Sequence, residues 1–70
     1  MEKVWKIDVP GNQGYSFAIK GEIEDELEAI YQASENGAFE DEHDARYATA
    51  EEITDDEDAL RAFKDCTITI

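Results

Sequence analysis

Asp and Glu are the reactive side chains that this sequence gathers into groups. The 70 residues include nineteen carboxylates against six Lys and Arg residues, which gives a net charge of −13. Most carboxylates fall in three runs, at residues 22–28, 35–44 and 51–58. Carboxylates grouped in this way can serve acid–base catalysis, bind a cation, or present negative charge to a basic partner.

Catalysis has little support among these residues. The chain has one histidine, His43, and one cysteine, Cys66, and it contains no nucleophile elbow, phosphate loop or Gly-rich fingerprint. A chain of this size cannot also enclose a substrate cavity of roughly 300–1,000 Å³. We therefore expect a protein that is not an enzyme and has no catalytic residues. Cys66 is expected to pack as a small apolar residue at a strand start, and His43 to be solvated in an acidic loop.

A metal site lacks the necessary spacing. A calcium-binding EF-hand loop needs Asp or Asn at alternating positions, a central Gly and a closing Glu, and neither 41–44 nor 55–58 has these features. For zinc, His43 and Cys66 are single ligands far apart in the sequence. We expect no metal and no cofactor, and a metal-binding regulator stays an alternative.

The charge is concentrated in the middle of the chain. Residues 21–60 hold sixteen acidic residues against Arg46 alone, a net charge of −15, whereas residues 1–20 and 61–70 each carry +1. This balance argues against direct binding to nucleic-acid phosphates or to anionic membranes, because both need Lys and Arg. It favours a basic partner, metal cations or a high-salt habitat.

The candidate partner-binding surface follows from this distribution. The like charges Glu22–Glu26 and Glu24–Glu28, each four residues apart on a predicted helix, cost about 0.2–0.5 kcal/mol per pair, so stability alone does not explain them. Acids near residue 55 are partly explained by the start of a helix, where negative charge is favourable. The expected surface comprises Glu22, Glu24, Asp25, Glu26, Glu28, Glu35, Glu40, Asp41, Glu42, Asp44, Glu51, Glu52, Asp55, Asp56 and Asp58.

Alternating apolar residues predict strands at both ends of the chain. Residues 3–9 and 15–20 alternate on either side of the turn-forming segment 10–14, which predicts a β-hairpin. Residues 66–70 alternate between Cys or Ile and Thr, which indicates a final strand. The segment 46–53 alternates weakly and is interpreted as a strand, although its composition would tolerate a helix.

Helical periodicity predicts two helices. The first begins at Glu22 and ends before Asn36-Gly37, and its inward face is formed by Ile23, Leu27, Ile30, Tyr31 and Ser34. A capping box at 54–57 predicts the second helix, with Thr54 as its N-cap. The fold class is therefore α+β, in one domain spanning 1–70: a small, mainly antiparallel sheet in ββαβαβ order with one or two helices packed on one face. Strand order and oligomeric state stay open.

The expected location is the cytoplasm, in particular that of a bacterial host cell. One cysteine allows no internal disulfide, and a small secreted domain would usually need such bonds. No apolar run reaches the length of a membrane span, and the first residues lack the pattern of a signal peptide.

The clustered acidic runs resemble one class of known proteins. Residues 22–28, 40–44 and 51–58, in a small chain without a catalytic set, are similar to acidic inhibitors encoded by phages and mobile elements, including anti-CRISPR and anti-restriction proteins that mimic nucleic acid. The resemblance implies a non-enzymatic inhibitor that occupies the positive channel of a nuclease or CRISPR effector. Two alternatives stay open: an acidic immunity protein or antitoxin that neutralises a basic toxin, and a halophile-adapted domain without charge-based recognition.

Overall fold

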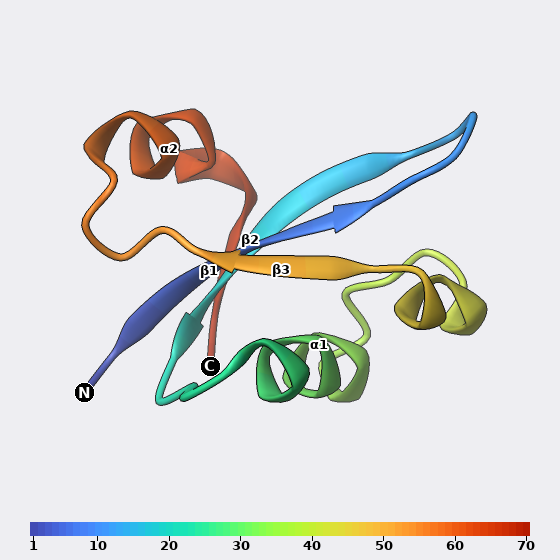
Figure 1. Cartoon of the computed structure of the whole chain (residues 1–70), viewed down its shortest axis with the longest axis horizontal. Coiled ribbons are helices and arrows are strands. Elements are labelled where there is room, and N and C mark those ends of the chain that lie inside the picture. The colour runs from blue at the N-terminus through green and yellow to red at the C-terminus, as the bar shows by residue number, and fades with distance from the viewer.

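Four strands form one mixed sheet that lies between two α-helices (Figure 1). The structure, a computed structural model, describes all 70 residues. The α+β class is confirmed. Along the chain the elements are β1 (Lys3–Val9), β2 (Tyr15–Gly21), α1 (Glu26–Glu35), the 3-10 helix η1 (Glu42–Arg46), β3 (Thr49–Glu52), α2 (Glu57–Ala62), the 3-10 helix η2 (Lys64–Cys66) and β4 (Thr67–Thr69).

The β1–β2 hairpin is the centre of the sheet, whose strand order is β3-β1-β2-β4. β1 pairs antiparallel with both β2 and β3, whereas β4 lies parallel to β2. The hairpin predicted from the sequence is confirmed, with Lys3 opposite Gly21 and Val9 opposite Tyr15. Its turn includes Gly11 at a φ of 118°, a conformation that side chains disfavour and glycine tolerates.

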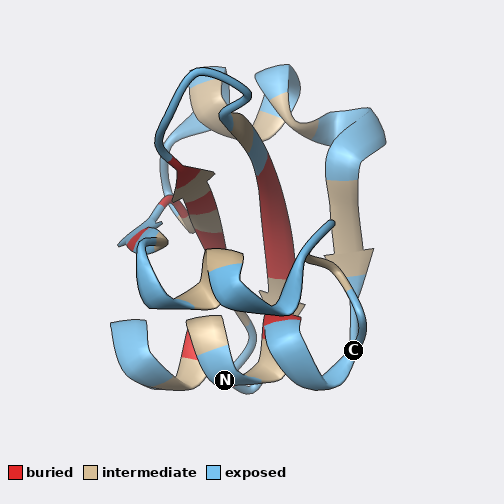
Figure 2. Cartoon of the chain, turned by 90° about the vertical axis from the view of Figure 1, so that its right-hand side faces the viewer, coloured by how far each residue is buried: buried red, intermediate tan, exposed pale blue.

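Each face of the sheet packs against a different helix. Trp5, Ile7, Phe17 and Ile19 form the larger core together with Ala29, Ala33 and other apolar residues. On the other face, Val4 and Ala18 form a second core with Ile53, against which Leu60 and Phe63 pack. Figure 2 shows the buried residues concentrated in the strands.

The two helices therefore do not share one face. The chain must travel from β3 at one edge to β4 at the other, and α1 already covers one face of the sheet. The connection through α2 crosses on the opposite face, which is why Val4 is buried although it alternates with Trp5 along β1.

The inward face of α1 differs from the predicted one. The helix begins at Glu26, after Asp25 as N-cap, and buries Ala29 and Ala33. Leu27 and Tyr31 are 78% and 60% exposed, so the prediction that they face the core is wrong. Ile23 is buried, but it precedes the helix, and its carbonyl accepts a hydrogen bond from Trp5 Nε1 at 3.1 Å. Because Ile23 fills the core from an extended segment, the helix closes on the sheet through its small alanines.

The end of α1 agrees with the sequence. Asn36 is the C-cap, and Gly37 follows at a φ of 67°. The Gly37 N–H donates to the Ser34 carbonyl at 3.1 Å and the Ala38 N–H donates to the Ala33 carbonyl at 3.0 Å. These two bonds form a Schellman motif, which satisfies carbonyls left free at the helix end.

The second half of the chain departs from the predictions in three places. β3 spans only Thr49–Glu52, because residues 42–46 form η1. Asp56, not Thr54, is the N-cap of α2, since the Thr54 hydroxyl instead accepts a hydrogen bond from the Val4 N–H at 3.0 Å. Cys66 is exposed in η2, so the expectation that it packs at a strand start is wrong.

Neither α-helix is both long enough and apolar enough to cross a membrane.

The register of α1 can be tested by paired substitutions. We expect Ala33→Leu to lower the free energy of unfolding by about 1–3 kcal/mol, because Ala33 is fully buried and a larger side chain would overpack the core. Leu27→Ala should change it by less than about 0.5 kcal/mol, because most of Leu27 already lies in solvent. Urea unfolding followed by circular dichroism measures both changes in the free energy of unfolding. A larger loss for Leu27→Ala than for Ala33→Leu would contradict this register of α1 and support the one predicted from periodicity.

Candidate functional site

The fold separates the three acidic runs between two ends of the sheet. The start of β1 lies beside the end of β2 and the end of β3, as the pairs Lys3–Gly21 and Trp5–Glu52 show. The segments 22–25 and 52–58 follow these strand ends and therefore meet at one end, called here the α2 end. The segment 40–44 precedes β3 and lies at the opposite end, beside the hairpin turn, called here the turn end. The predicted surface is thus two acidic regions, with α1 running between them.

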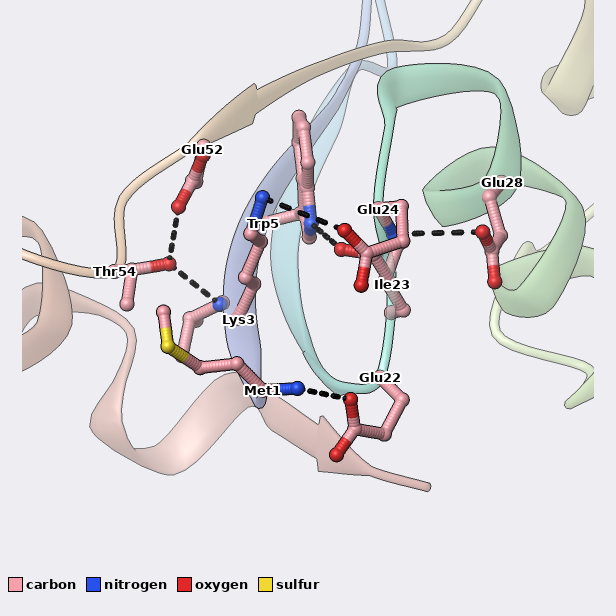
Figure 3. A network of polar contacts seen from close by, with 10 residues as sticks. Met1, Lys3, Trp5, Glu22, Ile23, Glu24, Glu28, Glu52 and Thr54 are labelled. Atoms are coloured by element: carbon pink, nitrogen blue, oxygen red, sulfur yellow. Dashed lines mark hydrogen bonds and ion pairs between the residues drawn. The ribbon is translucent and has the colours of Figure 1, made fainter.

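Polar contacts tie the α2 end together (Figure 3). The Glu22 carboxylate accepts a hydrogen bond from the N-terminal ammonium and raises the pKa of that group. Lys3 Nζ lies 3.8 Å from Glu24 Oε2, and the Glu24 N–H donates to Glu28 Oε2 at 3.4 Å. The Thr54 hydroxyl donates to Glu52 Oε2 at 2.8 Å. These contacts hold several acidic side chains in defined positions around the start of β1.

Three of the acidic residues cap helices. Asp25, Asp41 and Asp56 are the N-caps of α1, η1 and α2. Their carboxylates accept hydrogen bonds from backbone N–H groups of the first helical turn, at 2.8, 2.8 and 3.0 Å. Such bonds satisfy donors that a helix start leaves free, and each stabilises by about 1 kcal/mol. Part of the acidity is therefore structural.

Glu26 covers the exposed edge of the sheet at β3. Its Oε2 accepts a hydrogen bond from the Ala50 N–H at 3.4 Å. Edge strands with free N–H groups invite pairing with other chains, and charged side chains at the edge oppose it. On the same strand, Glu51 lies 3.8 Å from Lys6 Nζ. These two acids belong to the sheet edge as much as to a binding surface.

Tyr15 organises the turn end. Its hydroxyl accepts a hydrogen bond from the Glu40 N–H at 2.8 Å and donates one to Asp44 Oδ2 at 2.7 Å. Burial, together with the bond to Asp44, raises the pKa of the Tyr15 phenol. The neighbouring ring of Phe17 packs edge to face against Phe39, with ring centroids 5.6 Å apart. The hairpin thereby fixes the position of the segment 40–44, which includes the start of η1.

Within residues 21–60, four acidic side chains have no partner: Glu40, Glu42, Asp55 and Glu57 form neither hydrogen bonds nor ion pairs through their carboxylates. Two of them belong to each end. At the α2 end, Asp55 and Glu57 line an open hollow around Ile53, together with Glu52, Asp56 and Asp58. At the turn end, a second hollow is lined by Tyr15, Glu40, Asp41, Asp44 and residues of the hairpin turn. The carboxylates are spread along these surfaces, and no three metal-binding side chains converge on one point.

The sequence did not predict the positions of three residues on this surface. Glu57 lies in the hollow at the α2 end, whereas the sequence assigned it to a capping box. The exposed pair Leu27 and Tyr31 was assigned to the core, since helical spacing alone cannot distinguish an inward from an outward apolar stripe. Only the buried position of Ile23 decides between the two.

Comparison with known proteins found no family model, no curated protein and no solved structure that matches this chain.

The role of Tyr15 leads to a pH-dependent expectation. Tyr15→Phe removes both hydrogen bonds of the hydroxyl and should lower the free energy of unfolding by about 0.5–1.5 kcal/mol at neutral pH. Because the folded chain raises the pKa of Tyr15, the protonated phenol stabilises the fold below about pH 10, and this contribution is lost as the pH rises through the folded pKa. Denaturant titrations between neutral and strongly alkaline pH measure both effects.

The control for this experiment is Tyr47→Phe, since Tyr47 is exposed and its hydroxyl has no hydrogen-bond partner. Wild type should lose more stability than Tyr15→Phe in the alkaline range, and Tyr47→Phe should follow wild type. Equal alkaline loss in wild type and Tyr15→Phe would show that the hydroxyl does not hold the turn end.

Proposed function

We propose that this chain is a non-enzymatic inhibitor that binds the basic, nucleic-acid-binding surface of a nuclease or CRISPR effector and takes the place of nucleic acid there. One observation carries the proposal. Of the sixteen acidic residues in 21–60, four lie within ion-pair distance of a positive group: Glu22, Glu24, Glu51 and Asp58. The other twelve keep an uncompensated negative charge.

The hydrogen bonds described above do not reduce this charge. A cap or a bond to a hydroxyl fixes a carboxylate in place while leaving its charge intact. A surface whose charged groups are already positioned loses less entropy when it binds, so the same contacts yield a higher affinity. Fixed, unneutralised carboxylates on a small rigid frame are the features that a substitute for phosphates requires.

The proposed partner follows from electrostatics. An enzyme that binds nucleic acid holds it in a positively charged channel. Carboxylates at both ends of the sheet and along α1 can occupy such a channel, and long-range attraction would raise the rate of association. The same attraction would serve an immunity protein or antitoxin against a basic toxin, which stays the second candidate. Both roles would place the chain in the cytoplasm of a bacterial cell.

Two matched double variants test which end meets the partner. Asp55→Asn with Glu57→Gln neutralises the α2 end, and Glu40→Gln with Glu42→Gln neutralises the turn end. Each variant removes two charges without removing an internal contact. We expect the variant at the binding end to weaken binding about fivefold, because exposed ion pairs contribute about 0.5 kcal/mol each, and to make binding less sensitive to salt.

The measurement is displacement of labelled duplex DNA from candidate nucleases and CRISPR effector complexes, followed by fluorescence anisotropy at rising salt. If the wild-type chain displaces DNA from none of them at low salt, or if both variants match the wild type, recognition by charge is contradicted. Displacement from none of them, combined with specific rescue of cells poisoned by a basic toxin, would favour the second candidate.

Adaptation to a saline habitat and recognition of a basic partner predict different stabilities in dilute buffer. We expect the chain to melt in a single cooperative transition at about 10 mM ionic strength, because its two apolar cores and its helix caps do not depend on salt. Added salt should raise the melting temperature modestly by screening repulsion among the unneutralised acids. A chain that is unfolded in dilute buffer and folds only near molar salt would support adaptation to a saline habitat.

A further inference from the structure

The outward face of α1 carries an apolar pair that the fold leaves uncovered. Leu27 and Tyr31 lie one helical turn apart, and they are 78% and 60% exposed. Single exposed apolar residues are normal on protein surfaces, whereas two adjacent ones on a helix form a contiguous patch. The register of α1 produces this patch, because Ala29 and Ala33 occupy the face toward the sheet.

Carboxylates border this pair along the helix. Glu28 lies three residues before Tyr31 and Glu35 lies four residues after it, so both are neighbours of Tyr31 on the helical surface, whereas Glu24 belongs to the extended segment that precedes the N-cap Asp25. Glu35 accepts a hydrogen bond from the Tyr31 hydroxyl, and this bond raises the pKa of Tyr31. The Glu24 N–H bonds to the Glu28 carboxylate at 3.4 Å. Glu28 and Glu35 face no positive group within the chain.

We propose that Leu27 and Tyr31 are the anchor of a docking face on α1 that takes a basic amphipathic segment of a protein partner. The apolar side chains of that segment would cover the pair, while its Lys or Arg side chains would meet Glu24, Glu28 and Glu35. The inference rests on the proposed function and adds the chemistry of the partner surface. Apolar anchors surrounded by polar or charged residues are the usual arrangement of the energetically dominant part of a protein interface.

Charge selects this occupant over the others. A second copy of the chain carries the same −13 charge and would bring Glu24, Glu28 and Glu35 toward like charges. Nucleic acid and anionic membranes meet the same repulsion. A basic segment gains from the acids at long range and from the apolar pair at short range. The structure therefore assigns the two contributions to different residues, which makes them separable by experiment.

The test uses two synthetic helical peptides with equal positive charge. One presents a stripe of Leu flanked by Lys, and in the other every Leu is replaced by Gln. Isothermal titration of the full chain should show binding of both peptides at low salt, with the Leu peptide binding about tenfold or more tightly because it buries Leu27 and part of Tyr31. The excess affinity should persist as salt rises, since apolar burial is not screened.

Substitutions locate the preference. Leu27→Ser with Tyr31→Ser should remove the preference for the Leu peptide and leave binding of the Gln peptide unchanged, because both side chains are exposed and the net charge is the same. The matched control is Tyr47→Ser, which removes another exposed aromatic side chain from η1's C-cap and should keep the preference. Circular dichroism verifies that all three proteins are folded.

The outcomes distinguish this inference from the proposed function. Equal affinity of wild type for the two peptides, or a preference that survives in the Leu27 and Tyr31 variant, would overturn the docking face while leaving recognition by charge intact. Binding of neither peptide at low salt would overturn both. Sedimentation velocity over a concentration series adds one further outcome: a dimer that depends on Leu27 and Tyr31 would identify a second copy as the occupant and overturn the basic segment.

Discussion

Burial of both faces of the β1–β2 hairpin is the constraint on which the rest of this structure depends. The chain has twelve buried hydrophobic residues, and seven of them, from Val4 to Ile19, belong to these two strands. Each helix is too short to be stable by itself and persists through its contact with one face of the hairpin. The caps of the helices and the positions of the acidic segments follow from that packing, because each segment begins where a strand or helix ends.

The high negative charge is compatible with so small a core because many carboxylates have a local structural role. Aspartates are the N-caps of α1, η1 and α2, Glu26 covers the edge of β3, and Asp44 accepts a hydrogen bond from the hydroxyl of Tyr15. These contacts offset part of the repulsion among like charges while leaving most of the charge unneutralised. The chain thus combines a defined fold with a strong negative field, and the proposed recognition of a basic partner needs both.

The two contributions to the proposed binding surface come from different levels of structure. The negative field comes from composition and would be present in almost any arrangement of these residues. The apolar anchor on α1 exists only because the helix is rotated so that its alanines face the sheet. Long-range attraction raises the association rate and favours positively charged partners, whereas a local apolar contact slows dissociation of the complex. A partner that meets both conditions would be distinguished from other basic surfaces.

Local sequence patterns alone determined the α+β class, the hairpin with its turn, the end of α1 at Asn36 and Gly37, and the concentration of exposed acids in the middle of the chain. These features depend on interactions within a few residues, such as strand alternation and the φ angle that glycine permits at a helix end. The tertiary structure decided that Ile23 fills the core ahead of the helix, that Leu27 and Tyr31 face outward, and that Thr54 bonds to β1 while Asp56 caps α2. It also placed the acidic runs at two ends of the sheet. The physical reason is that apolar and hydrogen-bonding residues compete for a limited core, and this competition is settled by contacts between segments far apart in the sequence.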